Sequence, residues 1–406
     1  MAHLCAMTDF MKLLGAYGAS QIGDQVTLLA LPLVAALLLG AGPAEMGWLT
    51  AAAAAPFFLL GLPAGVWVDR LPRRSVILIA DLLRALVLLA VPAASLLGLL
   101  NLPLLIAVAL LAGTAAVFVD VASQTYVPEL VERCALLRAN GRFETWRAAA
   151  TIAGPGLAGA LSAAAGPALA LSASAVASLA ASGLVAGIGH RAPCHDPALR
   201  RPFLEELREG LSFLLQEPRL RALAFCALTW NVSWFALGAV LVLHAARNLG
   251  LGAAQIGLVF AMDGVGMLLG TLVAPRIEGR IGLGRVIILG PSLCALGTPL
   301  ILLATPETAL PLLAAGRFLY GFGPMVFSVT QNSLRQSLTP ARLLGRVNAS
   351  LRWLTWGLRP VGAVLGGLAG EFLGLTQAVA LAGIGLALCL VPLLASPVPR
   401  LRRLEA

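Results

Sequence analysis

Residues 65–74 read Gly65-Val66-Trp67-Val68-Asp69-Arg70-Leu71-Pro72-Arg73-Arg74, a charged decapeptide between two long apolar stretches. Apolar runs of about 20 residues recur along the chain, and each is long enough to cross a bilayer core of roughly 30 Å as a helix. Hydrophobic residues make up 59% of the 406 residues and charged residues only 12%, whereas soluble domains hold about 25% charged residues. The sequence therefore predicts an all-α polytopic membrane protein, in which the decapeptide forms a short loop between two spans.

The apolar runs predict twelve transmembrane helices in two sets of six. The first set covers residues 10–38, 46–66, 75–98, 103–126, 144–165 and 167–189, and the second covers residues 220–245, 253–275, 285–304, 309–333, 347–370 and 374–396. We expect an N-terminal six-helix bundle over 1–189, a cytoplasmic linker over 190–219 and a C-terminal six-helix bundle over 220–406. Apolar residues recur at helical spacing in the linker, at Phe203, Leu204, Leu207, Leu211, Leu214 and Leu215. They predict an amphipathic helix, either along the inner membrane surface or as an ordinary linker helix.

The positive charges fall on one side of the predicted spans. The net charge is +9, and with the N-terminus inside and an even number of spans, nearly every arginine outside the spans lies in a cytoplasmic loop. The loops on the opposite side hold essentially Arg247 alone. This is the positive-inside pattern, so the charge indicates orientation and gives no reason to expect a nucleic-acid partner. We expect both termini in the cytoplasm and a location in the bacterial cytoplasmic membrane.

The two halves of the chain repeat each other. The tripeptide Arg138-Ala139-Asn140 before the fifth span matches Arg346-Val347-Asn348 before the eleventh, 208 residues later. At the same offset, the small-residue run with Gly154, Pro155 and Gly159 matches the run with Gly362, Gly366 and Gly367. The decapeptide has a decayed partner in Arg276-Ile277-Glu278-Gly279-Arg280. Parallel repeats of six spans are typical of one large class of secondary transporters.

The decapeptide resembles the signature loop between the second and third spans of the major facilitator superfamily, although Trp67 and Pro72 depart from the usual pattern. Its sequel Asp81-Leu82-Leu83-Arg84, the Val127-Pro128-Glu129-Leu130 end of span four and the Gly345-Arg346-Val347-Asn348 entry to span eleven are similar to bacterial drug- and macrolide-efflux and enterobactin-export members. The resemblance implies two pseudo-symmetric six-helix halves that rock about a central cavity. It also implies a conformational gate formed by Gly65, Asp69, Arg70, Arg73 and Arg74. In that gate Asp69 would engage the start of span eleven, and Arg73 or Arg74 a carboxylate at the end of span four.

Ionisable residues inside the spans are the candidates for coupling, because each charge near the bilayer centre costs roughly 2.5–3.5 kcal/mol. The candidates are Asp24, Asp120, Arg147, Asp81, Arg84 and Asp263. Asp24, halfway along span one, is the first candidate for binding a proton or a cationic substrate. Asp120 and Arg147 are expected to pair, either for structure or for coupling. Asp81 and Arg84 are three residues apart and predict a local ion pair.

Aromatic and amide residues in the spans are candidates for a cavity wall. They are Gln21, Gln25, Gln124, Trp230, Trp234, Arg317, Tyr320, Trp353 and Trp356. Trp230 and Trp234 lie one turn apart and share a helix face, which suits a lipophilic substrate, while core packing is the alternative for each aromatic residue. The glycines at Gly154, Gly159, Gly362, Gly366 and Gly367, with Pro155, are candidates for close helix packing. By resemblance, the run at Gly154 is a partial copy of a motif of antiporter members.

The motifs of other protein classes are missing from the sequence. Lys12 is the only lysine and is followed by Leu13, so there is no P-loop, and neither GxSxG nor HExxH occurs. The six cysteines form no CxxC pair, and we expect no enzyme activity, cofactor or metal site. The expected function is proton-coupled efflux of an amphipathic drug, macrolide or siderophore-like compound by a monomer in the bilayer. The alternatives are a lysophospholipid flippase or nutrient importer of the same fold, and a transport-inactive sensor or partner subunit.

Overall fold

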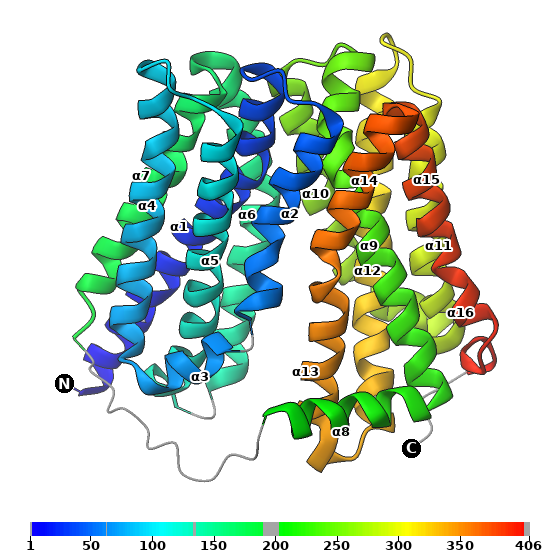
Figure 1. Ribbon diagram of the computed structural model, residues 1–406. Helices are drawn as coiled ribbons and strands as arrows, with labels where there is room; N and C mark the ends of the chain where they lie inside the picture. Colours follow the sequence, from blue (N-terminus) through cyan, green and yellow to red (C-terminus); the bar gives the residue numbers. More distant parts are fainter. Residues whose placement is uncertain (1, 62, 133–134, 190–202, 402–406) are drawn as a thin grey trace. The chain divides into compact units, whose positions relative to one another are not determined.

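A computed structural model describes residues 2–61, 63–132, 135–189 and 203–401, and the elements within these ranges are helical (Figure 1). Ten of the helices are long and apolar enough to cross a membrane. The other two predicted spans, the second and the eleventh, are each divided into two shorter helices, 43–59 with 63–70 and 341–357 with 359–373. Together they give the twelve-helix arrangement expected from the sequence.

The helices pack as two compact units. Unit 1 comprises the described residues of 1–41, 52–198 and 252–261, and unit 2 those of 42–51, 199–251 and 262–406. Unit 1 is built on α1 (Ala2–Leu37), α3 (Pro63–Arg70), α4 (Arg73–Leu96), α5 (Leu102–Leu130), α6 (Leu136–Ala165) and α7 (Pro167–Ala186). In this unit α1 packs against α6 and α7, and α4 packs between α5 and α7. The apolar core therefore surrounds α1 and α4, which carry Asp24, Asp81 and Arg84.

Unit 2 is built in the same manner on the second half of the chain. Its helices are α8 (Phe203–Gln216), α9 (Pro218–Leu243), α11 (Leu283–Leu302), α12 (Ala309–Leu338), α13 (Ala341–Gly357), α14 (Arg359–Leu373), α15 (Leu375–Leu388) and α16 (Leu390–Leu394). A π-helical turn, His244–Asn248, extends α9. The main contacts join α11 to α12 and α9 to α14 and α15. The face of α9 toward these helices carries the aromatic residues of the site described below.

Each unit includes a short segment from the other half of the sequence. The first residues of α2 (Pro43–Leu59) belong to unit 2, and the first residues of α10 (Ala253–Ile281) belong to unit 1. Glycine permits both contacts: a Cβ atom on Gly47 would lie 2.9 Å from the Ala363 carbonyl oxygen, and one on Gly159 would lie 2.6 Å from the Ala253 carbonyl oxygen. Small residues at such positions let helix backbones touch.

The charged decapeptide is mostly helical, so the predicted loop is wrong over most of its length. Helix α3 continues to Arg70, and α4 begins at Arg73, which leaves only Leu71 and Pro72 between them. The apolar residues of the decapeptide continue the preceding span. The helix ends before Leu71, because a proline disfavours helical backbone at the residue before it, and Pro72 itself is extended, with φ −60° and ψ 112°. The break in span two lies earlier, between the end of α2 and the start of α3 at Pro63.

Helix α8 packs against protein through its apolar face. Leu214 is buried in a cluster with Leu343, Val347 and Leu351 of α13. A Cβ atom on Gly210 would lie 2.5 Å from the Arg346 carbonyl oxygen, so the two backbones are in contact. Glu209 forms an ion pair with Arg346. The amphipathic pattern of the linker therefore marks a helix docked on α13; the linker residues before it, 190–202, lie outside the described part of the chain (Figure 1).

Candidate intramembrane charge clusters

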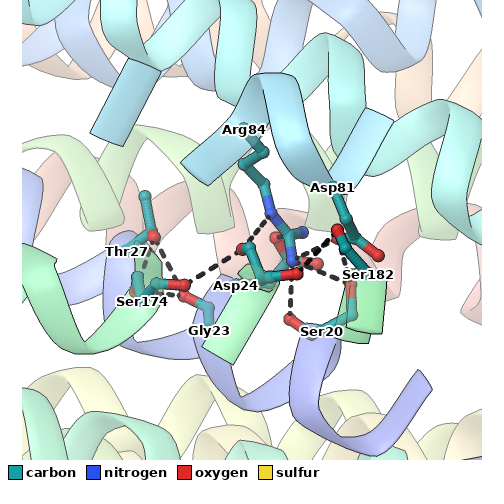
Figure 2. Close-up of polar contacts among 9 residues, drawn as sticks. Ser20, Gly23, Asp24, Thr27, Asp81, Arg84, Ser174 and Ser182 are labelled. Atoms are coloured by element: carbon teal, nitrogen blue, oxygen red, sulfur yellow. Dashed lines mark hydrogen bonds and ion pairs between the residues drawn. The ribbon is translucent and has the colours of Figure 1, made fainter. Parts of the chain in front are cut away.

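One guanidinium group in unit 1 pairs with two carboxylates from different helices. Arg84 on α4 lies 2.5 Å (Nη1) from Asp24 Oδ1 on α1 and 2.9 Å (Nη2) from Asp81 Oδ1 one turn back on α4. Figure 2 shows the Arg84 side chain reaching between the two carboxylates. The local Asp81–Arg84 pair expected from the sequence is present, but the partner of Asp24 was not foreseen.

Hydroxyl groups complete the surroundings of Arg84 (Figure 2). Its Nη2 donates to Ser20 Oγ at 2.8 Å, and its Nε donates to Ser178 Oγ of α7 at 2.9 Å. Ser20 Oγ lies 3.2 Å from Asp81 Oδ1 as well. The arginine side chain is 1% exposed, Asp81 is equally buried, and Asp24 is 23% exposed. The cluster is therefore closed around Asp81 and open at Asp24.

The charge balance of this cluster is uneven. Two carboxylates face one guanidinium, so the three groups carry one surplus negative charge when both carboxylates are ionised. Asp81 Oδ2 is buried and receives no hydrogen bond from any described residue. A buried anionic oxygen without a donor is costly, and a proton on either carboxylate removes the surplus charge.

A second group of unit 1 charges joins α1, α5 and α6. Arg147 Nη2 lies 3.7 Å from Asp120 Oδ1, so the expected pair is present, and the same atom is 3.7 Å from Glu144 Oε1. Arg147 also donates to the Tyr17 hydroxyl at 3.1 Å. The arginine is 38% exposed, and the charge of Asp120 also acts on Asp24. This group forms a looser, more hydrated neighbour of the Arg84 cluster.

Two arginines of the expected gate, Arg73 and Arg74, contact the ends of neighbouring helices. Arg73 forms an ion pair with Glu129 at the end of α5, and the Arg73 side chain is 8% exposed. Arg74 donates to the backbone carbonyls of Val185 and Ala186 at the end of α7. The expected contact of an arginine with a carboxylate at the end of span four is therefore made by Arg73. The side chain of Asp69 lies outside the described part of the structure, so its expected contact stays a prediction, and Gly65 has open space around it.

In unit 2 the buried ion pair joins α10 to α12. Arg317 pairs with Asp263, and both side chains are almost fully buried. Asp263 Oδ1 receives no hydrogen bond from the described residues. The Arg317 guanidinium lies 4.8 Å from the centroid of the Trp234 ring, a cation–π contact. The two residues were separate candidates in the sequence, and no spacing rule could link them because they lie 54 positions apart.

An aromatic group surrounds that pair. Trp230 and Trp234 stack with ring centroids 5.2 Å apart, and Tyr320 meets Trp234 edge-on at 5.4 Å. The Tyr320 hydroxyl hydrogen-bonds Thr298 at 2.6 Å, and Trp230 Nε1 donates to Cys294 Sγ at 3.2 Å. The tryptophans are partly buried and Tyr320 is fully buried, so Tyr320 packs in the core while the indoles keep an accessible edge.

The neighbouring face of α9 meets the break in span eleven. Arg359, at the start of α14, donates from Nε to Asn231 Oδ1 at 2.9 Å and lies 4.3 Å from the centroid of the Trp356 ring. Arg352 lies 4.1 Å from the centroid of the same ring. Sequence reasoning noted the tryptophans and missed Arg352, although Arg352, Trp356 and Arg359 have the spacing that puts residues on one helix face.

The remaining candidates divide between packing and accessible positions. Gln21 and Gln25 are partly buried on α1, Gln124 is exposed on α5, and Trp353 is partly buried on α13. The glycine candidates lie at close helix contacts, because a Cβ atom on any of Gly154, Gly159, Gly362, Gly366 and Gly367 would lie 2.7 Å or less from a neighbouring helix. The small-residue motif thus occupies contacts that only a residue without a side chain permits.

The comparisons with known proteins agree with this architecture. A major facilitator family model described as "Transmembrane secretion effector" matches residues 8–406. The chain is 30% identical to the multidrug efflux pump Tap of Mycolicibacterium fortuitum over 398 residues, 94% of each chain. It is 27% identical to the uncharacterized MFS-type transporter y4rN of Sinorhizobium fredii, covering 90% of this chain and 89% of that one.

Solved structures share the fold at low identity. The nucleoside transporter NupG aligns with a TM-score of 0.76 at 14% identity, over 95% of this chain and 98% of that chain. A bacterial homologue of the iron transporter ferroportin, in an inward-facing state, aligns with a TM-score of 0.75 at 19% identity, over 95% and 98%. The family match covers nearly the whole chain, and its relatives are transporters, not enzymes. The chain is a multi-pass membrane transporter of the major facilitator superfamily, in the branch described as transmembrane secretion effectors.

Proposed function

We propose that this protein is a proton-coupled exporter of an amphipathic small molecule, working by alternating access in the bacterial cytoplasmic membrane with both termini in the cytoplasm. One observation carries the coupling: Arg84 is shared by Asp24 and Asp81. The relative named as a multidrug efflux pump favours export over import. The aromatic faces of α9 favour a substrate with an apolar body.

The surplus negative charge is the reason to place the proton on this cluster. An uncompensated charge inside a membrane span costs roughly 2.5–3.5 kcal/mol, whereas one proton on Asp24 or Asp81 makes the three-residue group neutral. The nearby ionisable groups are Asp120 on α5 and Arg147 on α6, whereas the packed face of α7 contributes only serines. Because the carboxylates share one guanidinium, they titrate as a coupled pair.

The exposures of the two carboxylates suggest separate roles. Asp24 is 23% exposed and so offers the entry and exit point for the proton, whereas Asp81 is 1% exposed and holds Arg84 in place. When the proton leaves, Arg84 can compensate only one carboxylate fully. Moving α1 away from α4 would take Asp24 away from the Asp81–Arg84 pair and relieve this charge imbalance, and the reverse movement would restore it. Proton binding can in this way bias an alternating-access equilibrium.

The gate residues fit the same scheme. Arg73 and Glu129 fasten the start of α4 to the end of α5, and Arg74 caps the carbonyl end of α7. Cations are favourable at helix C-termini because the helix dipole is negative there. We propose that these contacts keep α4, α5 and α7 together as one body while the transporter changes state.

Transport in proteoliposomes tests the proposal. Purified protein would be reconstituted, a pH gradient imposed or omitted, and uptake followed for a macrolide, a catecholate siderophore, a nucleoside and a lysophospholipid. We expect gradient-dependent movement of the macrolide or siderophore, and its loss in Asp24→Asn and Asp81→Asn. Movement that is independent of the gradient in the wild type would overturn proton coupling, and movement of the lysophospholipid or nucleoside alone would favour a flippase or an importer.

A matched control separates coupling from general damage. Glu144→Gln changes an exposed carboxylate that is 3.7 Å from Arg147 but outside the Arg84 cluster. It should leave gradient-driven transport near the wild-type rate. Substrate exchange without a gradient, measured on the same vesicles, should survive in Asp81→Asn, because exchange needs the conformational cycle and no net proton movement.

A further inference from the structure

Arg359 carries a charge that no carboxylate balances. It is partly buried at the first position of α14, and its Nε donates to Asn231 at 2.9 Å. The guanidinium otherwise lies over two rings, 4.3 Å from the centroid of Trp356 and 5.2 Å from that of Phe235. Among the described residues no carboxylate forms an ion pair with it, whereas Arg84 pairs with two carboxylates and Arg317 with Asp263. An isolated charge in a membrane span marks a functional position.

A second cation, Arg352, lies against the same indole. Arg352 is exposed one turn before Trp356, and its guanidinium lies 4.1 Å from the centroid of the Trp356 ring. The charges of Arg352 and Arg359 act on each other. Like charges repel each other, so the charge of Arg352 makes an anion beside Arg359 more favourable.

The local backbone fixes this arrangement. Pro360 follows Arg359 and cannot donate a hydrogen bond to the Trp356 carbonyl, which is why span eleven breaks into α13 and α14 at Leu358. Helix α13 has 17 residues, so the break lies about 25 Å from the start of α13. On α9, Asn231 and Phe235 share one face and hold Arg359 from the other side. The Nε bond to Asn231 orients the guanidinium and leaves its Nη groups without a hydrogen-bond partner among the described residues.

We propose that Arg352, Trp356 and Arg359 form a binding site for anionic amphipathic compounds, those with a carboxylate, sulfonate or phosphate group on an apolar body. Guanidinium groups bind such anions through paired, charge-assisted hydrogen bonds. The rings of Trp356 and Phe235 supply apolar surface for the attached body. The inference rests on the proposed export function, since it names the charge class of the exported compound.

Binding without transport tests this site. Full-length protein in phosphatidylcholine nanodiscs would be titrated calorimetrically with 1-naphthylacetate and with its uncharged analogue 1-naphthylacetamide, with empty nanodiscs as the blank. We expect the wild type to bind the carboxylate at least about tenfold more tightly than the amide. Arg359→Gln should abolish that preference by weakening the carboxylate alone, and Arg359→Lys should keep part of it.

Another basic region of unit 2 provides the matched control. A surface cavity of about 890 Å³ is lined by Arg280, Arg285 and Arg400 and could attract the probe by charge alone. Arg285→Gln should keep the preference for the carboxylate over the amide. If Arg285→Gln lost this preference and Arg359→Gln kept it, the assignment would be overturned. If Arg359→Gln fails to give monodisperse protein, Arg352→Gln makes the same test at an exposed position.

A titration with an anionic lipid distinguishes a substrate anion from a lipid headgroup. The titration would be repeated in nanodiscs containing phosphatidylglycerol. If phosphatidylglycerol leaves the naphthylacetate affinity of the wild type unchanged, the site is a substrate site. If phosphatidylglycerol weakens naphthylacetate binding to the wild type but not to Arg359→Gln, the site binds a lipid headgroup, and the assignment to a substrate is overturned. The binding assay uses no pH gradient, so its result does not depend on whether transport is coupled to protons. Equal binding of acid and amide by the wild type would overturn the inference and leave the transport proposal standing.

Discussion

The Asp24–Arg84–Asp81 cluster of unit 1 and the Arg352–Trp356–Arg359 cluster of unit 2 differ in the sign of their charged groups. In the first, two carboxylates share one guanidinium and serines fill the remaining contacts. In the second, two guanidinium groups share one indole, and Arg359 has an amide in place of a carboxylate. The first has a surplus negative charge that a proton can neutralise. In the second, Arg359 pairs with no carboxylate of the described residues, and its charge suits an anion. The two clusters therefore differ in the sign of the charge that lacks a partner: a carboxylate in unit 1 and the Arg359 guanidinium in unit 2.

The largest effect is expected from breaking the unit 1 cluster. Arg84→Gln leaves two carboxylates facing each other without a cation, and removing one partner of a buried ion pair typically destabilises a protein by about 3–5 kcal/mol. We expect a marked fall in the thermal unfolding midpoint in detergent and no measurable transport. The double variant Arg84→Gln with Asp81→Asn should regain part of the lost stability. Equal stability of single and double variants would show that the carboxylates do not depend on Arg84.

The next prediction compares two arginines of unit 2. Arg317→Gln strands Asp263, which is 8% exposed, so a loss of about 3–5 kcal/mol is expected. Arg359→Gln strands no carboxylate and loses a hydrogen bond and ring contacts, each worth about 1 kcal/mol. Thermal unfolding of the two variants under one condition checks the difference. Equal destabilisation would contradict the absence of a carboxylate partner at Arg359.

A smaller effect, alike in both units, is expected at the glycine contacts. Gly159→Leu in unit 1 and Gly367→Leu in unit 2 place a side chain against a neighbouring backbone, at a cost of about 1–3 kcal/mol each. Gly156→Leu is the matched control on α6, because a Cβ atom there meets nothing within 4 Å. Unfolding midpoints should fall for the first two only. A normal midpoint in Gly159→Leu would contradict the close packing of α6 on α10.

The smallest effect is expected at Arg147. Its guanidinium is 38% exposed and 3.7 Å from each of two carboxylates, and such exposed ion pairs contribute about 0–1 kcal/mol. Arg147→Gln should shift the unfolding midpoint little and slow transport less than Arg84→Gln. If Arg147→Gln instead matched Arg84→Gln in both measurements, the coupling centre would have to include Asp120.

The fold could be predicted from the sequence because membrane spans are encoded locally. The lengths of the apolar runs predicted the twelve helices, and the prediction of a helical transporter fold is confirmed. The charges of residues 65–74 predict a loop, but the apolar residues between them extend the span as a helix to Arg70. Pro360 was the available signal for the break in span eleven.

The site could be predicted only in part, because its pairings are not local. The Asp81–Arg84 pair follows from a spacing of three along one helix, whereas Asp24–Arg84 and Asp263–Arg317 join residues 60 and 54 positions apart. No periodicity encodes which helices become neighbours. The spacing of Arg352, Trp356 and Arg359 is visible in the sequence, whereas the contacts of Arg359 with Asn231 and Phe235 on α9 are not.

Proton movement in reconstituted vesicles tests the central claim most directly, namely that the cluster of Asp24, Arg84 and Asp81 holds the transported proton. Vesicles loaded with a pH-sensitive dye would receive a compound that the wild type transports, and proton and substrate movement would be recorded together. We predict coupled movement in the wild type, and substrate movement without proton movement in Asp81→Asn, which has no surplus charge. Unchanged proton movement per substrate in both Asp24→Asn and Asp81→Asn would contradict the account.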